Sequence, residues 1–220
     1  MGLQGKRAVP LPLLAVASLS ATAQDSGSST LTINGGKTSV YMGAIETPHV
    51  VKPEVCVGFH DNICGHGYVA KIGWTVSDGS PVNFEWSPAN QFKSAKSGTT
   101  KKITVGLGFI QGTNSTLIEL IKDCDNKPCT NPDGLPESKQ LCHGMVQNMP
   151  TFGTTGTTVV SFRCVVKLAK GKNYWVLMQS PANSWLAWNT SDAAMGLGYL
   201  GENDSWVNDG TQPMGALTVQ

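Results

Sequence analysis

Six cysteines carry the chemistry in this sequence that depends most directly on spacing: Cys56, Cys64, Cys124, Cys129, Cys142 and Cys164. An even number of cysteines in an exported chain usually forms a disulfide framework. Proximity along the chain favours Cys56 with Cys64 and Cys124 with Cys129, which leaves Cys142 to pair with Cys164. We predict these three bonds as structural disulfides.

The segment His60-Asp-Asn-Ile-Cys64-Gly-His66 has the ligand types and spacing that a zinc site could use. A structural zinc site needs four ligands, and an exported Cys64 is more simply explained as a disulfide partner of Cys56. We therefore predict no metal at these residues.

A second oxygen-rich segment could in principle coordinate calcium through Asp123, Asp125, Asn126, Asn131 and Asp133. Their order does not follow the calcium-loop pattern of alternating acidic residues and a final glutamate. A polar turn explains them without a metal. The sequence leaves calcium binding by this loop open, and we assign no metal ligand here.

Catalysis would require a nucleophile with its base, or paired carboxylates. Candidate bases are His49, His60, His66 and His143, and the glutamates that could pair in a suitable fold are Glu85, Glu119 and Glu137. The sequence contains no Gly-x-Ser-x-Gly elbow, His-Glu-x-x-His helix motif or Walker loop. We assign no catalytic residue and predict that the protein is not an enzyme.

Six tryptophans offer the main indication of binding, because flat aromatic faces stack on sugar rings and anchor protein interfaces. They are Trp74, Trp86, Trp175, Trp185, Trp188 and Trp206. Tryptophans in a β-sandwich mostly lie in the core, and we expect Trp74 and Trp175 to be buried. The sequence does not identify the ligand-binding residues.

The N-terminal residues have the three parts of an export signal. Lys6 and Arg7 supply the positive charge, residues 8–17 are apolar, and Ala21-Thr22-Ala23 has the form of a signal peptidase site. We predict a signal peptide over residues 1–23 and a mature N-terminus at Gln24. The protein is then secreted, to the periplasm or outside the cell. The apolar run is shorter than the roughly 20 residues that cross a bilayer, so we predict no membrane span.

The charge composition argues against nucleic acid as a partner. Lys and Arg number 16 and Asp and Glu 15, which gives a formal net charge of +1. This balance provides no basic surplus for a phosphate backbone. Charged residues make up 14% of the chain, and it contains 25 glycines, a balance typical of short strands joined by many turns.

Alternation of apolar and polar residues predicts an all-β protein. In residues 101–110, Ile103, Val105, Leu107 and Phe109 share one face. We expect a hairpin to a second strand over 116–122, in which Ile118 and Leu120 share one face. Further strands are expected over 138–148, 157–167, 174–179, 185–189 and 214–219. We predict an antiparallel β-sandwich, jelly-roll-like, of about eight to ten strands. It forms a single domain over residues 39–220, after a flexible polar leader over 24–38.

One tetrapeptide occurs twice, as Ser87-Pro-Ala-Asn90 and Ser180-Pro-Ala-Asn183. Serine, proline and asparagine are common turn residues. Chance explains this recurrence better than duplicated half-domains do.

Several motifs follow one another in an order that resembles a known family. They are Gly73-Trp-Thr-Val76, Gly106-Leu-Gly-Phe-Ile-Gln-Gly-Thr-Asn114, Asn148-Met-Pro-Thr-Phe-Gly153, Tyr174-Trp-Val176 and Asn183-Ser-Trp-Leu-Ala-Trp-Asn189. On these motifs the chain resembles the bacterial choice-of-anchor R domain proteins. The resemblance implies an exported β-sandwich of unknown biochemical role, without known catalytic residues.

The sequence therefore predicts an exported or surface-associated β-sandwich that acts as a binding or structural module without a cofactor. Its expected partner is an extracellular glycan or protein. The alternative is a polysaccharide-directed hydrolase or lyase, which would need some of the histidines and glutamates named above to meet in the fold.

Overall fold

A computed structural model describes residues 32–33, 39–41, 58–64, 68–79, 82–129, 140–153, 159–202 and 205–220. The predicted signal peptide, its cleavage point, Cys56, His49, His66 and Glu137 lie outside these residues. The described part of the chain consists of strands and their connections, with every strand pair antiparallel. The predicted all-β, antiparallel class is confirmed.

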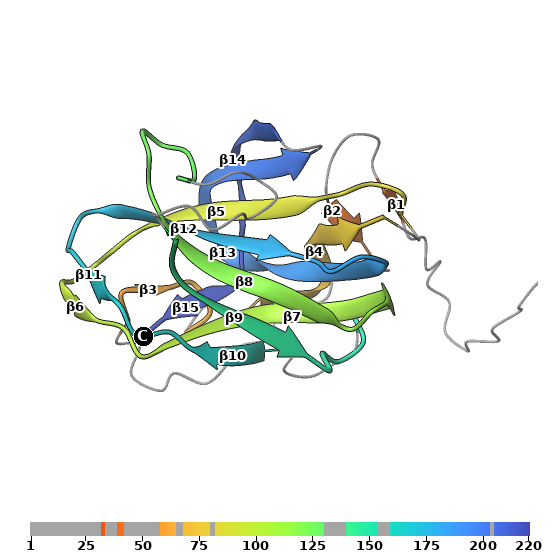
Figure 1. The fold of residues 1–220 in the computed structure, drawn as a ribbon, viewed down its shortest axis with the longest axis horizontal. Helices are drawn as coiled ribbons and strands as arrows, with labels where there is room; N and C mark the ends of the chain where they lie inside the picture. Colours follow the sequence, from red (N-terminus) through yellow and green to blue (C-terminus); the bar gives the residue numbers. More distant parts are fainter. Residues whose placement is uncertain are drawn as a thin grey trace, which may run out of the picture.

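The first of two layers is a sheet in which the strands follow the order β14-β13-β5-β12-β8-β9 (Figure 1). Its strands are β14 (Ser205–Gly215), β13 (Ser184–Glu202), β5 (Ser87–Lys93), β12 (Asn173–Gln179), β8 (Ser115–Lys122) and β9 (Gln140–Gln147). The side chains of β12 alternate between the two faces of this sheet. Those that enter the main core are Tyr174, Val176 and Met178, and those that pack on the outer face are Trp175 and Leu177. Both faces of the central strand are therefore apolar.

The second layer contains β1 (Thr32–Ile33), β2 (Ser39–Tyr41), β4 (Tyr68–Asp78), the first half of β13, and β7 (Lys102–Gly112). Strand β7 also pairs with β10 (Val159–Arg163) and with β15 (Leu217–Val219), and β15 pairs with β3 (His60–Asp61). A separate short pair joins β6 (Gly98–Thr99) to β11 (Lys167–Leu168). Because β13 pairs with β4 and β7 in its first half and with β5 and β14 in its second, it connects the two layers.

The main core lies between these layers. Ile103, Val105 and Leu107 of β7 are fully buried and belong to the same apolar cluster as Ile118 and Leu120 of β8. The predicted alternation of both strands is therefore confirmed. The glycines of β7 permit close packing, since a Cβ at Gly108 would lie 2.7 Å from the Phe152 Cα.

The predicted hairpin between residues 101–110 and 116–122 is wrong. Strand β7 pairs with β10, β13 and β15, whereas β8 pairs with β12 and β9. The short connection between β7 and β8 instead carries the chain from one layer to the other. Each of the two strands has one strongly apolar face. These faces pack against each other across the core, so the strands lie in different layers and do not pair within one sheet.

Other element boundaries also differ from those expected. The strand predicted over 157–167 ends at Arg163, and Cys164, Val166 and Leu168 continue along the core without a continuous strand. Strand β13 extends well beyond 185–189. Strand β1 lies inside the segment 24–38, predicted as a leader, where the β-branched Thr32 and Ile33 pair with β2.

The structure describes 15 strands, more than the expected eight to ten, and nine of them have five or more residues. Disulfides join Cys124 to Cys129 and Cys142 to Cys164, as the spacing predicted. Cys64 is also disulfide-bonded, and its predicted partner Cys56 lies outside the described residues. Within the described residues, no helix is long and apolar enough to cross a membrane.

Candidate functional site

Glu119 is the most unusual titratable group on the outer face of the first sheet. It lies on β8 directly opposite His143 of β9, and only 2% of its surface is exposed. The Gln140 amide donates a hydrogen bond to Glu119 Oε1. Burial raises the pKa of Glu119 to about 7, and the bond from Gln140 lowers it to a smaller extent. The fold thus places Glu119 opposite His143 on neighbouring strands, two residues that the sequence identified as separate candidates for catalysis.

This pair does not form the two-carboxylate arrangement of a glycosidase. The cross-strand neighbours of Glu119 are His143 on β9 and Leu177 on β12, so neither of them is a second carboxylate. Glycosidase carboxyl groups lie about 5 to 10 Å apart. A single buried acid can donate or accept a proton, but it cannot by itself supply both roles.

We expect Glu119 to make folding stability depend on pH. The pKa of Glu119 in the folded chain lies above its ordinary value of 4.5, so the fold favours the protonated carboxyl group. The folding stability that this protonated group contributes is fully present below about pH 4.5 and is lost as the pH rises through 7. Glu119→Gln should raise the free energy of unfolding by about 2 to 3 kcal/mol at pH 8 and change it little at pH 4.5. Urea unfolding at both pH values measures this. The exposed carboxyl variant Asp125→Asn is the control and should show no such difference; equal effects of Glu119→Gln at both pH values would contradict the prediction.

His60 and Cys64, two of the residues considered for zinc, have other roles in the fold. His60 lies 5.2 Å from the Phe92 ring, between ring centroids, and its buried Nε2 has no hydrogen-bond partner. Burial lowers its pKa to about 4, and the charge of Asp61 opposes this shift to a smaller extent. Because Cys64 is disulfide-bonded, it cannot bind zinc as a thiolate. The described residues contain no group of three or more His, Cys, Asp or Glu side chains that could hold a metal ion.

Asp123, the first residue of the possible calcium loop, supports the sheet beneath it. Its Oδ1 accepts hydrogen bonds from Trp175 Nε1 at 2.7 Å and from Gln91 Nε2 at 2.8 Å. Asn131 and Asp133 lie outside the described residues. The carboxylate of Asp123 therefore satisfies a buried indole on the outer face of the first sheet, a structural role that its position in a polar turn did not reveal.

The tryptophans mostly belong to the core. Trp74 and Trp175 are buried as expected, and Trp86, Trp185 and Trp188 are buried as well. Trp206 is partly exposed, and its ring lies 6.5 Å from that of Tyr199. Five of the six indoles are thus excluded from stacking on a sugar at the surface.

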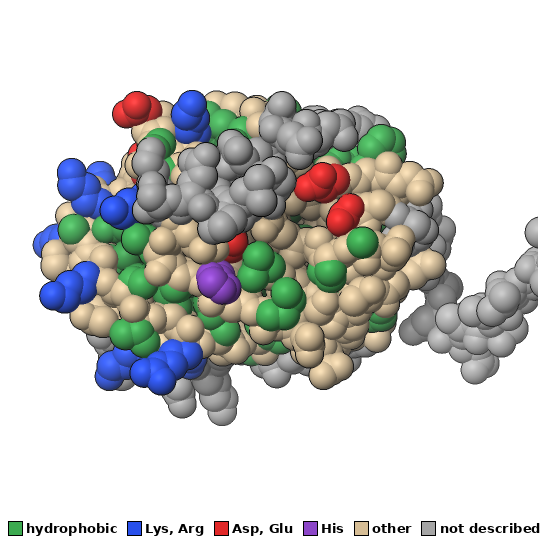
Figure 2. Space-filling view, viewed as in Figure 1, with side chains coloured by type: hydrophobic (Ala, Val, Ile, Leu, Met, Phe, Trp, Pro, Cys, Tyr) green, Lys and Arg blue, Asp and Glu red, His purple; other side chains and the backbone are tan. Residues whose placement is uncertain are grey.

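The positive charges gather at one end of the molecule, at the left of Figure 2. We call this surface the basic end; it comprises Lys93, Lys96, Lys101, Lys102, Lys122, Arg163, Lys167, Lys170 and Lys172. Strand pairing brings them together, since Lys102 lies opposite Arg163, Lys167 opposite Thr99, and Lys93 opposite Asn173. All except Lys96 are exposed. The basic end holds nine of the 16 Lys and Arg residues of the chain.

Few described carboxylates accompany the basic end. Asp61, Asp123 and Asp125 lie on neighbouring segments, and the first two already accept hydrogen bonds. Asp61 Oδ1 accepts from the backbone N–H groups of Ile63 and Cys64, at 3.0 and 2.8 Å. The net charge of +1 therefore conceals a strong local excess of positive charge.

An open hollow of about 440 Å³ lies within the basic end. It is lined by Phe59, Lys96, Ser97, Gly98, Thr99, Lys101 and Gln220, and the Lys96 ammonium lies 4.9 Å from the centroid of the buried Phe59 ring. Ammonium and hydroxyl groups are suited to anionic and hydroxyl-bearing ligands. The hollow is large enough for a sugar residue.

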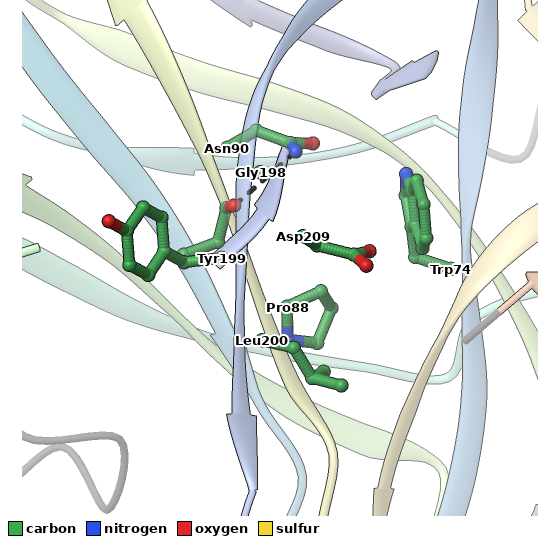
Figure 3. Close-up of a pocket in the computed structure, with 8 residues that line it drawn as sticks. Trp74, Pro88, Asn90, Gly198, Tyr199, Leu200 and Asp209 are labelled. Carbon is green, nitrogen blue, oxygen red and sulfur yellow. Dashed lines mark hydrogen bonds between the residues drawn. The ribbon is translucent and has the colours of Figure 1, made fainter. Parts of the chain in front are cut away.

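Two other hollows differ from this one in size and charge. A groove of about 260 Å³ at another part of the surface is lined by Asp78, Glu85, Ser87, Leu117, Met145, Gln179, Ser180 and Pro181, so its charged residues are all acidic. A pocket of about 10 Å³ lies beside Trp74, Asn90, Tyr199 and Asp209, where the Asp209 carboxylate points into the space between Pro88 and Trp74 (Figure 3). This pocket has room for about one water molecule and is too small for a sugar.

The sequence contains three Asn-x-Ser/Thr glycosylation sequons, which begin at Asn114, Asn189 and Asn203. The asparagines of the first two are engaged in the fold. Asn189 is buried and its amide donates to the carbonyls of Val69 and Ala70. Asn114 exchanges two hydrogen bonds with the backbone of Met149. Asn203 lies outside the described residues. Attachment of a glycan at Asn189 would require this region to open.

Comparison with known proteins adds no relative. No family model matches the sequence, and no curated protein or solved structure matches it.

Proposed function

We propose that this chain is an exported binding module whose basic end holds an acidic polysaccharide. The observation that carries the proposal is the clustering of nine cationic side chains around an open hollow lined by lysines and hydroxyls. A linear polymer of uronate or sulfated sugars presents carboxylate or sulfate groups at regular intervals, and many weak Coulombic contacts to such a polymer add up.

The composition of the basic end favours a glycan over nucleic acid. Eight of its nine cations are lysines, so Arg163 alone supplies the planar fork that makes paired hydrogen bonds to bases and phosphates. Stacking on bases needs exposed aromatic rings. The one aromatic ring that lines the hollow, Phe59, is 3% exposed and lies beneath Lys96.

The predicted export supports the same assignment. A signal peptide places the mature chain where acidic glycans are present, and the disulfides Cys124–Cys129 and Cys142–Cys164 fit an oxidising compartment. The resemblance to the choice-of-anchor R domain proteins also implies an exported β-sandwich. Surface association would then place the basic end near the polymers that it binds.

Titration calorimetry with polygalacturonate tests the proposal. Its methyl-esterified form has the same backbone with blocked charges and serves as the matched ligand. We expect binding of polygalacturonate that weakens as salt increases, and little binding of the ester. Lys101→Gln with Lys170→Gln should weaken binding about fivefold, at roughly 0.5 kcal/mol for each exposed charge.

A control variant distinguishes the effect of the local charge at the basic end on affinity from the effect of the net charge of the chain. Val207→Glu with Thr211→Glu changes the net charge by the same amount on exposed positions of β14, away from the basic end (Figure 1), and should leave affinity nearly unchanged. Equal losses in both variants, or preference for duplex DNA over polygalacturonate, would overturn the proposal. Release of sugar fragments during the titration would favour the alternative, a polysaccharide-directed hydrolase or lyase.

A further inference from the structure

We infer that Lys102 and Arg163, together with the hydroxyl groups of Thr104 and Ser161, bind a sulfate ester of the polysaccharide. We call these four residues the sulfate site. The inference rests on the proposed function, because it assigns a chemical class to the ligand of the basic end. It states that the group recognised at this place is a sulfate ester and not the carboxylate of a uronate.

Strand pairing places the four side chains of the sulfate site on one face of a sheet. Strands β7 and β10 lie side by side at the lower edge of the molecule in Figure 1, and their register sets Lys102 opposite Arg163 and Thr104 opposite Ser161. The residue pair between these two packs in the main core. Because side chains alternate along a strand, the sulfate site faces away from the core, and its two cations and Ser161 are exposed.

The two cations of the sulfate site come close together. The Cys164 N–H donates to the Lys101 carbonyl at 3.0 Å, which makes these residues a hydrogen-bonded pair. Hydrogen-bonded and non-hydrogen-bonded pairs alternate along an antiparallel ladder, so the adjoining pair of Lys102 and Arg163 is of the second kind, with Cα atoms about 4.5 Å apart. Like charges directly opposite each other destabilise the pairing of two strands. An anion bound between them removes this repulsion.

Little negative charge accompanies the sulfate site. Strands β3, β7, β10 and β15 contain one carboxyl side chain among them, that of Asp61 on β3, and β15 separates β3 from β7. Asp61 Oδ1 already accepts hydrogen bonds from the Thr218 hydroxyl at 3.0 Å and from two backbone N–H groups of its own turn. The backbone oxygen of Gln220 accepts from the N–H groups of Lys101 and Lys102, at 2.5 and 3.0 Å.

The sulfate site presents hydrogen-bond donors of three kinds. The hydroxyl oxygens of Thr104 and Ser161 lie 2.8 Å apart and share a hydrogen bond. In such a pair one hydroxyl donates to the other, and the second keeps its hydrogen for an outside acceptor. Arg163 adds a planar fork of N–H donors and Lys102 an ammonium group, and neither side chain can accept a hydrogen bond. A sulfate ester has three terminal oxygens in a tetrahedral arrangement, which gives each kind of donor an acceptor.

The alternative anions match these donors less well. A carboxylate has two oxygens in one plane, and the fork of Arg163 alone can occupy both of them. A phosphate monoester with a single charge keeps one P–OH group, which needs an acceptor that neither Lys102 nor Arg163 offers. A sulfate ester has no such hydrogen and stays ionised. It is therefore the anion that fits the sulfate site best.

Three derivatives of one polymer test the inference: dextran sulfate, carboxymethyl dextran and dextran phosphate of equal substitution. Each is titrated calorimetrically into the whole chain at about pH 5, where a phosphate monoester carries about one charge. Dextran sulfate should bind about fivefold more tightly than either of the others, roughly the effect of one additional hydrogen bond. Equal affinity for the sulfate and carboxymethyl forms, or a preference for dextran phosphate, would overturn the inference and leave the proposed function intact. Failure of all three polymers to bind would overturn both.

A charge-changing variant tests the position of the sulfate site. Arg163→Gln should weaken the binding of dextran sulfate about tenfold, since it removes charged hydrogen bonds. Lys127→Gln is the matched control, because it changes the net charge equally at an exposed position outside the basic end, and it should alter affinity less than about twofold. Equal losses in the two variants would contradict the assignment of sulfate binding to Arg163.

A second variant tests the hydroxyl pair while leaving every charge in place. Thr104→Val combined with Ser161→Ala should weaken the binding of dextran sulfate about threefold, because one neutral donor is lost. The same variant should bind carboxymethyl dextran as the parent chain does, since a carboxylate held by the arginine fork makes no use of the hydroxyl. Unchanged affinity for dextran sulfate, or an equal loss for both polymers, would show that the hydroxyl groups do not select sulfate.

Discussion

Replacing Trp188 with alanine should lower the free energy of unfolding by about 3 to 5 kcal/mol, the usual effect of removing a large aromatic side chain from a core. Trp188 is fully buried between the layers, and its Nε1 donates to the Ala216 carbonyl at 3.0 Å. The backbone fits closely around it, since a Cβ at Gly215 would lie 2.1 Å from Trp188 Cε2. Surrounding atoms can only partly fill the space that the indole leaves, which adds a cavity to the lost burial.

Trp206→Ala is the matched control for this prediction. Trp206 is partly exposed and packs at the edge of the outer cluster with Tyr199, so we expect a loss of about 1 kcal/mol. Urea unfolding followed by circular dichroism measures both variants. Similar losses for the two residues would contradict the assignment of Trp188 to the core and of Trp206 to the surface.

Removing the Cys142–Cys164 disulfide with a double alanine variant should lower the free energy of unfolding by about 3 kcal/mol. Cys142 lies on β9 in the first layer, and Cys164 follows β10 in the second. The bond therefore joins the two layers at the edge of the core. Its cysteines are separated by 22 residues in the sequence, so it restricts the unfolded chain considerably.

The double alanine variant of Cys124 and Cys129 is the comparison. These cysteines are only five residues apart, and their bond closes a local turn, so its entropic effect on the unfolded chain is smaller. Thermal and urea unfolding of both variants, with mass spectrometry to verify the remaining bonds, tests this order. Equal or reversed losses would show that loop entropy does not determine the contribution of these disulfides.

Local pattern was sufficient to predict the class of fold. Alternating apolar residues in β7 and β8 predicted which side chains enter the core, because side chains in a strand point to opposite faces at every second residue. Cysteine spacing likewise predicted both disulfides that the structure contains in full. Alternation does not specify which strands pair, however. The predicted hairpin between β7 and β8 was therefore wrong, although the buried faces of both strands were predicted correctly.

The repeated Ser-Pro-Ala-Asn tetrapeptide shows the limit of local pattern directly. Residues 87–90 begin strand β5, where Asn90 Oδ1 accepts a hydrogen bond from the Gly215 backbone N–H at 2.7 Å. In the second copy, Asn183 has a φ of 60° and ends the turn before β13. The same four residues thus form a strand or a turn according to the partners that the rest of the chain supplies.

The sequence by itself determined the alternation of strand faces, the disulfide pairing by proximity and the near-neutral total charge, because each depends on composition or on neighbouring positions. Only the tertiary structure decided that nine cations share one end and that burial raises the pKa of Glu119 to about 7. Electrostatic potential and desolvation depend on distances between residues far apart in the chain, and those distances are set by which strands pair and which layer each strand joins.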